Sequence, residues 1–141
     1  MSKPAPFPHR YTVVLSEGRL LAPPRAVIAL GPPPQFGGTD IVWSPEELLV
    51  GAVLECFWTT FSAYAKRESL EVRDWSGTGL GILDRGPTVP AFTSIALTVE
   101  LGVPAGDEER ARRVLANAEK NCIIAHALNV PISVDAKVRA A

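Results

Sequence analysis

The longest amphipathic pattern in the chain follows Ser44 and predicts one helix that ends near Glu68. Apolar residues recur there at steps of three and four, which gathers them on one wide face of a helix. Ser44 suits the N-cap, Pro45 suits the first helical position, and Glu47 completes a capping-box pattern. Cys56 lies in the middle of this predicted helix, on its apolar face.

Two strand-like runs follow this helix, at 70–83 and 91–101, and a turn at 84–87 joins them. In the second run, large apolar residues mostly alternate with smaller or polar ones, as in a half-buried strand. Alternating glycines in the first run predict close packing on one face or a bulge, and they are Gly77, Gly79 and Gly81.

A second helix is predicted to open at Asp107, which suits an N-cap, and to carry an apolar side. Cys122 belongs to that apolar side. A short apolar run at 122–128 follows, and Pro131 begins a last strand that reaches about Val138. The second cysteine is therefore expected at the end of a helix, just before the terminal strand.

Prolines punctuate the first third of the chain and separate two short β-like runs at 10–15 and 25–30. The link 16–19 predicts a hairpin turn in which Gly18 takes a positive φ. The proline- and glycine-rich segment 31–40 predicts a loop. We expect residues 1–9 to form a flexible, proline-rich arm and residues 10–141 a single domain. The element order is strands, helix, strands, helix, strand, which indicates an α+β fold.

Composition narrows the class of protein. The chain has 141 residues and a formal net charge of −1, which argues against a broadly basic nucleic-acid binder or a polybasic membrane-surface protein. A membrane-spanning helix needs about 20 apolar residues, and no such run is evident, so we expect no membrane partner. The N-terminus lacks the apolar core of a signal peptide, and a cytoplasmic location is expected.

The chain has two cysteines, which are either inert core thiols or a redox couple. A reactive Cys56 needs a cation to favour its thiolate, because burial in an apolar face works against the charge. The candidates for that cation are Arg10, Arg19, Arg25 and His126. Glu46 or Glu47 at the start of the helix suits the task of aiming an arginine. Glu46 precedes Cys56 by ten residues, or about 15 Å along the axis, so the arginine has to bridge them.

The stretch from Gly37 to Cys56 resembles the signature of the OsmC/Ohr family. In that family a glycine-containing loop leads to an Asn/Ser-Pro-Glu-x-Leu helix start, and a cysteine follows ten residues after the glutamate. The segment 119–128, with Cys122 and His126, is similar to the family's second cysteine segment. The element order agrees from about Tyr11 to Val138.

The resemblance implies an OsmC-like fold, with antiparallel sheets around a long central helix, and an intertwined homodimer with active sites at the interface. It implies an enzyme that reduces organic hydroperoxides. Cys56 would be the peroxidatic residue and Cys122 the resolving residue, which forms a disulfide with it. Glu46 would orient the catalytic arginine, for which Arg19 is the first candidate and Arg25 the second. A dithiol, typically a lipoylated protein, would reduce the enzyme, and no cofactor or metal is implied.

The sequence departs from the family pattern at three places. Aligned on the glycine of the turn, the family's catalytic arginine falls at Ser16, and Arg19 matches a second arginine. The residue after the resolving cysteine is commonly proline, and here it is Ile123. Glu55 stands beside Cys56, where small residues are usual.

The residues also fit two other interpretations of the chain's function. A non-catalytic OsmC-like dimer would bind a small apolar or acyl ligand at its interface, with both cysteines as packing. Cys122 and His126 have a spacing that suits two metal ligands, but a protein site needs at least three, and no third ligand is evident. Several aromatic residues fit either an apolar pocket for alkyl peroxides or the core, and they are Trp43, Phe57, Trp58, Phe61 and Tyr64.

Overall fold

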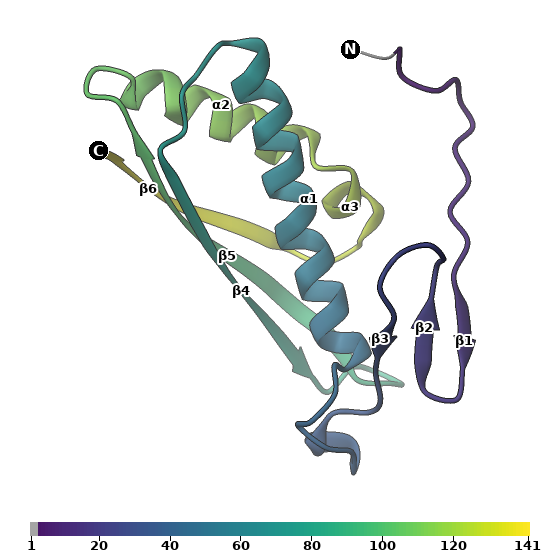
Figure 1. Cartoon of the computed structure of the whole chain (residues 1–141). Helices are drawn as coiled ribbons and strands as arrows, with labels where there is room; N and C mark the ends of the chain where they lie inside the picture. Colours follow the sequence, from purple (N-terminus) through teal and green to yellow (C-terminus); the bar gives the residue numbers. More distant parts are fainter. Residues whose placement is uncertain (1–2) are drawn as a thin grey trace. The chain divides into compact units, whose positions relative to one another are not determined.

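The computed structural model describes residues 3–141, which divide into two compact units between Pro45 and Glu46 (Figure 1). The first unit is a small sheet with long connections. The second contains the long helix, a three-stranded sheet and two further helices. The proposed boundary between an arm at 1–9 and a domain at 10–141 stays a prediction.

The first unit is built on the antiparallel strands β1 (Val14–Ser16), β2 (Arg19–Leu21) and β3 (Ile28–Ala29). Gly18 has a φ of 70° in the turn between β1 and β2, which confirms the predicted hairpin. The strand bounds were wrong, because β1 begins four residues later than expected and pairs with β2, a strand that the pattern did not indicate. The predicted loop contains one 3-10 turn, η1 (Pro34–Phe36).

The helix α1 (Pro45–Arg67) begins directly after Ser44, as predicted, and ends one residue before Glu68. Acidic residues lie in its first turn and basic residues in its last, as the helix dipole favours. Within the described part of the chain, α1 is a helix long and apolar enough to cross a membrane by length and composition, contrary to the sequence expectation. Its buried residues instead pack in the core of the second unit.

The sheet of the second unit has the order β4 (Asp74–Asp84), β5 (Ala91–Val103), β6 (Ile132–Ala140). β4 and β5 form an antiparallel pair with a register shift between Ile82 and Leu83. β6 joins β5 in parallel, so this sheet is mixed, whereas antiparallel sheets were expected. The connection from β5 to β6 passes through α2 and α3, and a parallel pair requires such a crossover.

Glycines allow α1 to lie very close to β4. A Cβ atom at Gly79 would come within 2.7 Å of Val50 Cγ1, and one at Gly81 within 2.6 Å of Val50 Cγ2. A Cβ atom at Gly77 would come within 3.0 Å of Leu54 Cδ1. The alternating glycines therefore serve close packing on the helix-facing side of the strand, one of the two roles predicted for them.

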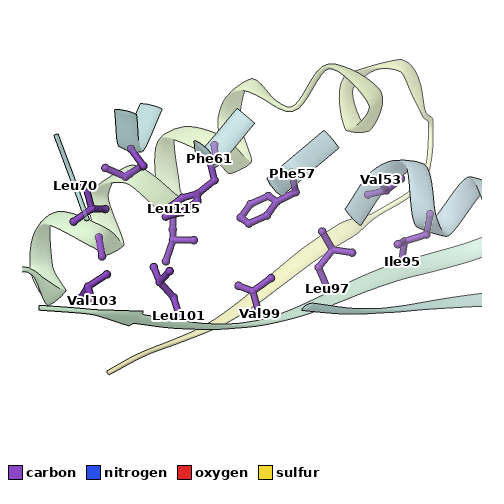
Figure 2. Close-up of a cluster of buried hydrophobic side chains, with 14 residues drawn as sticks. Val53, Phe57, Phe61, Leu70, Ile95, Leu97, Val99, Leu101, Val103 and Leu115 are labelled. Atoms are coloured by element: carbon purple, nitrogen blue, oxygen red, sulfur yellow. The ribbon is translucent and has the colours of Figure 1, made fainter. Parts of the chain in front are cut away.

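The core lies between the sheet and the two longer helices, which cover the same sheet face (Figures 1 and 2). Phe57 and Phe61 of α1 are fully buried and point toward the apolar side chains of β5 in Figure 2. Trp75 of β4 stacks on Phe61, with ring centroids 5.2 Å apart. These two phenylalanines therefore belong to the core, which was one of the two interpretations of the aromatic residues.

The second helix breaks into two at Cys122. α2 (Glu108–Asn121) ends there, and α3 (Ile123–Ala127) begins there, because Cys122 has an extended backbone with φ −68° and ψ 111°. Asp107 occupies the N-cap of α2 as predicted, but its carboxylate pairs with Arg110 at 3.1 Å instead of capping the helix. The break is the local feature that positions the second cysteine.

Candidate functional site

The structure brings the two cysteines together, although they are far apart in the sequence. Cys56 projects from the middle of α1, and Cys122 lies at the junction of α2 and α3. The two side chains are close enough for Cys56 to raise the pKa of the Cys122 thiol, and both thiols are free. Two neighbouring free thiols are candidates for a disulfide, which joins cysteines whose Cα atoms lie within about 7 Å of each other.

Cys122 is the buried member of the pair, with 2% of its surface exposed. Burial raises the pKa of the Cys122 thiol, and the neighbouring Cys56 raises it further. Backbone hydrogen bonds from Ala125 and Ile124 act in the opposite direction. Cys122 is the N-cap residue of α3, and its side chain makes no capping hydrogen bond of ordinary geometry there.

Cys56 is the more accessible member, and its side chain is half-buried. The backbone N–H of Ile124 donates a hydrogen bond to Cys56 Sγ over 3.5 Å. The first turn of α3 thus contacts both sulfur atoms.

Glu46 lies in the first turn of α1 and carries an unsatisfied atom. Its Oε2 is buried and accepts no hydrogen bond from any residue in the described range 3–141. A buried carboxylate oxygen without a donor is costly, and a guanidinium group would satisfy it. The other glutamate of that turn, Glu47, has an exposed side chain.

The candidate arginines belong to the first unit. Arg19 opens β2 and faces Ser16 across the turn, so the two positions that the family pattern aligns with arginine lie at the same end of the hairpin. Arg25 lies in the connection before β3, and Arg10 precedes β1. Which of them serves Cys56 stays a prediction.

Glu55 and His126 are both exposed. The ring of His126 hydrogen-bonds through Nε2 to the carbonyl oxygen of Lys120, near the end of α2. Over residues 3–141, no group of three or more His, Cys, Asp or Glu side chains is arranged to hold a metal ion.

Sequence reasoning missed the backbone donors of α3. Cys122 was expected on the apolar side of the second helix, and its extended backbone, after which the N–H of Ile124 donates to the Cys56 sulfur, was not foreseen. The one available signal was the short apolar run after Cys122, which ends at Asn129 and is separate from the helix before it.

The chain matches the family model described as OsmC-like protein over residues 38–137, and it belongs to that family. Among curated proteins it is 24% identical over 119 residues to the uncharacterized protein YmaD of Bacillus subtilis, which covers 80% of this chain and 79% of YmaD. The α+β fold predicted from the sequence is confirmed.

Solved structures with the same fold include an OsmC-like protein of unknown function from Vibrio cholerae, with 17% identity, a TM-score of 0.74, and coverage of 84% of this chain and 82% of that one. Another, an organic hydroperoxide resistance protein of the same organism with captopril bound in one of its active sites, has 20% identity and a TM-score of 0.73, with 92% and 91% covered. An organic hydroperoxide resistance protein from Elizabethkingia anophelis has 16% identity and a TM-score of 0.72, with 94% and 99% covered.

Proposed function

We propose that the chain is a cytoplasmic, homodimeric peroxidase that uses Cys56 and Cys122 to reduce organic hydroperoxides in the response to oxidative stress. The observation that carries this proposal is the contact between the two free thiols. Inert core cysteines have no reason to meet, whereas a two-cysteine redox cycle requires it. The names of the hydroperoxide resistance proteins that share the fold support the same activity.

In the proposed cycle, the Cys56 thiolate attacks the terminal oxygen of the hydroperoxide. The O–O bond breaks, an alcohol leaves, and Cys56 becomes a sulfenic acid. Cys122 then attacks the Cys56 sulfur, water leaves, and a disulfide forms. A dithiol, of which a lipoylated protein is the expected kind, reduces this disulfide by thiol–disulfide exchange.

Glu46 is the residue that we expect to orient an arginine toward Cys56, and its buried, unsatisfied Oε2 supports that role. Arg19 is our first choice for the arginine, and Arg25 is the second. A guanidinium beside Cys56 would favour the thiolate and would hydrogen-bond the peroxide oxygens. It would also satisfy the buried carboxylate oxygen.

The homodimer is supported by the amount of apolar surface on the first unit. Phe7 and Tyr11 are each 87% exposed, and Leu15 is 66% exposed. A sheet of strands only two or three residues long is marginal by itself, so a second copy would bury surface that this unit leaves in water.

The experiment that tests the function is consumption of tert-butyl hydroperoxide with dihydrolipoamide as the reductant. We expect turnover by the wild type and a loss of at least 100-fold, roughly, in Cys56→Ser, because a serine hydroxyl is a far weaker nucleophile than a thiolate and forms no sulfenic acid. Far-UV circular dichroism checks that the variant is folded. Equal turnover by the two proteins would contradict the role of Cys56, and no turnover by the wild type would favour the non-catalytic, ligand-binding dimer.

A further inference from the structure

The two cysteines differ in how far an external molecule can reach them. Only 2% of the surface of Cys122 is exposed, whereas Cys56 is half-buried. A thiol of a reductant is larger than a water molecule, so it needs more room at a sulfur atom than 2% of exposed surface provides. While the fold is intact, a reductant therefore has a route to Cys56 and none to Cys122.

Cys56 lies at the border between the buried and the exposed faces of α1. Val53, three residues before it, is fully buried, whereas Thr59, three residues after it, is exposed. The N–H of Ile124 donates to Cys56 Sγ over 3.5 Å, so α3 lies against one side of this sulfur. Cys122 is the N-cap residue of α3 and belongs to that same side. The open side of Cys56 is therefore the side that faces away from Cys122.

The direction of attack in thiol–disulfide exchange makes this arrangement selective. A thiolate attacks one sulfur atom of the disulfide while the other sulfur leaves. The entering sulfur approaches in line with the S–S bond, from the side opposite the leaving sulfur. Attack on Cys56 then comes from its open side, whereas attack on Cys122 would have to pass through the buried surroundings of that residue.

We propose that the reductant attacks Cys56 and not Cys122 when it reduces the disulfide, an inference that rests on the proposed function. A dithiol in its thiolate form, R–S⁻, donates an electron pair to Cys56 Sγ. The Cys56–Cys122 bond breaks, a mixed disulfide forms between R and Cys56, and Cys122 leaves as a thiolate that takes up a proton. The second thiolate of the dithiol then attacks the sulfur of R, which releases the Cys56 thiolate and closes the oxidised, cyclic disulfide of the reductant.

Both halves of the cycle then take place at one sulfur atom. The hydroperoxide is attacked by Cys56, and the reductant attacks Cys56, so the two substrates use the same approach to the protein. Cys122 exchanges bonds only with Cys56, which is a partner that its burial allows it to reach.

The first test maps the adduct that a monothiol forms with the oxidised protein. The wild type is treated with one equivalent of tert-butyl hydroperoxide or, in parallel, with diamide, and the Cys56–Cys122 disulfide is verified by mass spectrometry. 2-Mercaptoethanol, which has no second thiol to complete the reduction, is then added, and samples are quenched at intervals with excess N-ethylmaleimide. Peptide mapping shows which cysteine carries mercaptoethanol and which carries maleimide.

Extrapolated to zero time, the adduct on Cys56 should exceed the adduct on Cys122 by at least about 10-fold, because the rate of exchange depends on access to the sulfur. Equal amounts, or an adduct mainly on Cys122, would overturn the proposal. If diamide forms the disulfide and the hydroperoxide does not, the proposed function is wrong, and the diamide-treated protein still decides which sulfur is attacked. Failure of both oxidants would overturn both.

A second measurement tests access without any oxidation of the protein. Dithiodipyridine labels reduced Cys122→Ser, whose thiol is Cys56, and reduced Cys56→Ser, whose thiol is Cys122, after circular dichroism has verified that both variants are folded. We expect Cys122 to react at least about 100-fold more slowly than Cys56, because a buried thiol reacts only when the surrounding structure opens. The two rates should converge in concentrated urea. Comparable rates in the folded proteins would overturn the proposal.

Discussion

The backbone N–H of Ile124 donates a hydrogen bond to the sulfur of Cys56 over 3.5 Å, across 68 positions of the sequence. This bond joins the middle of α1 to the first turn of α3. It exists because the chain breaks at Cys122, which places the N-cap sulfur of α3 against the Cys56 sulfur. One short helix thus contacts both atoms on which the proposed chemistry depends.

Replacing Glu46 by glutamine should slow the reaction of Cys56 with tert-butyl hydroperoxide by about 10- to 100-fold, the cost of losing one hydrogen bond to a charged group. The physical reason is that an amide does not hold a guanidinium as a carboxylate does. Stopped-flow oxidation of the reduced protein measures the rate. Glu47→Gln is the matched control, since glutamine also fits its place in a capping box, and its rate should stay at the wild-type level.

The same assay identifies the arginine. If Arg19 acts through Glu46, the double variant Glu46→Gln, Arg19→Ala should be no slower than Arg19→Ala alone, because each change removes the same interaction. In the double variant of Arg25→Ala and Glu46→Gln, the two losses in rate should then multiply, because the two changes remove different interactions. The reverse pattern would assign the role to Arg25.

The stability of the reduced protein should fall as the pH rises above about 9. Burial raises the pKa of Cys122 above its ordinary value of 9.0, so the folded chain binds this proton more tightly than the unfolded chain. Below the unfolded pKa the stabilisation is complete, and it is lost as the pH rises toward the folded pKa. The loss is at most about 1.4 kcal/mol for each pH unit.

Urea unfolding in the presence of a reductant, at intervals from pH 7 to pH 11, measures this slope. Cys122→Ser carries no titratable group at this position and should show a shallower decline. Cys56→Ser should keep most of the decline, because burial outweighs Cys56 as the cause. Identical slopes for the wild type and Cys122→Ser would show that the buried thiol does not titrate in the way described.

Introducing a side chain at Gly79 should destabilise the second unit. In Gly79→Ala the new Cβ would lie 2.7 Å from Val50 Cγ1, and such overpacking costs about 1–3 kcal/mol. Val50→Ala removes the opposing methyl groups, so the double variant should be more stable than the sum of the two changes predicts. Gly51→Ala is the control, because its added Cβ would meet nothing within 4 Å apart from the adjacent backbone of its own helix. The thermal unfolding midpoints of the four variants are compared with that of the wild type. A Gly79→Ala variant as stable as the wild type would be inconsistent with the close packing of α1 on β4.

The sequence predicted best those features that depend only on neighbouring residues. The Ser44-Pro45 start and the glutamates of the first turn defined the beginning of α1, and the charge and capping of that turn require no distant contact. The glycine spacing on β4 was readable for a similar reason, because only glycine tolerates a helix so close to a strand. Identifying Cys56 and Cys122 as a pair depended on the resemblance to the family.

Other features depend on distant contacts and left no local signal. The parallel pairing of β6 with β5 follows from the path of α2 and α3. The strands of the first unit are two or three residues long, which is too short for a period of two to stand out. The hydrogen bond from Ile124 uses a backbone N–H, a group that every residue except proline carries, so its side chain gives no indication of it.

The central claim is that Cys56 and Cys122 form one redox couple. The most direct measurement is mass spectrometry of the protein after proteolysis without reductant, following one equivalent of tert-butyl hydroperoxide. Our account predicts a peptide pair linked by a Cys56–Cys122 disulfide, which disappears after treatment with dihydrolipoamide. Two free thiols after the peroxide has been consumed, or a disulfide only between Cys56 residues of different chains, would contradict it.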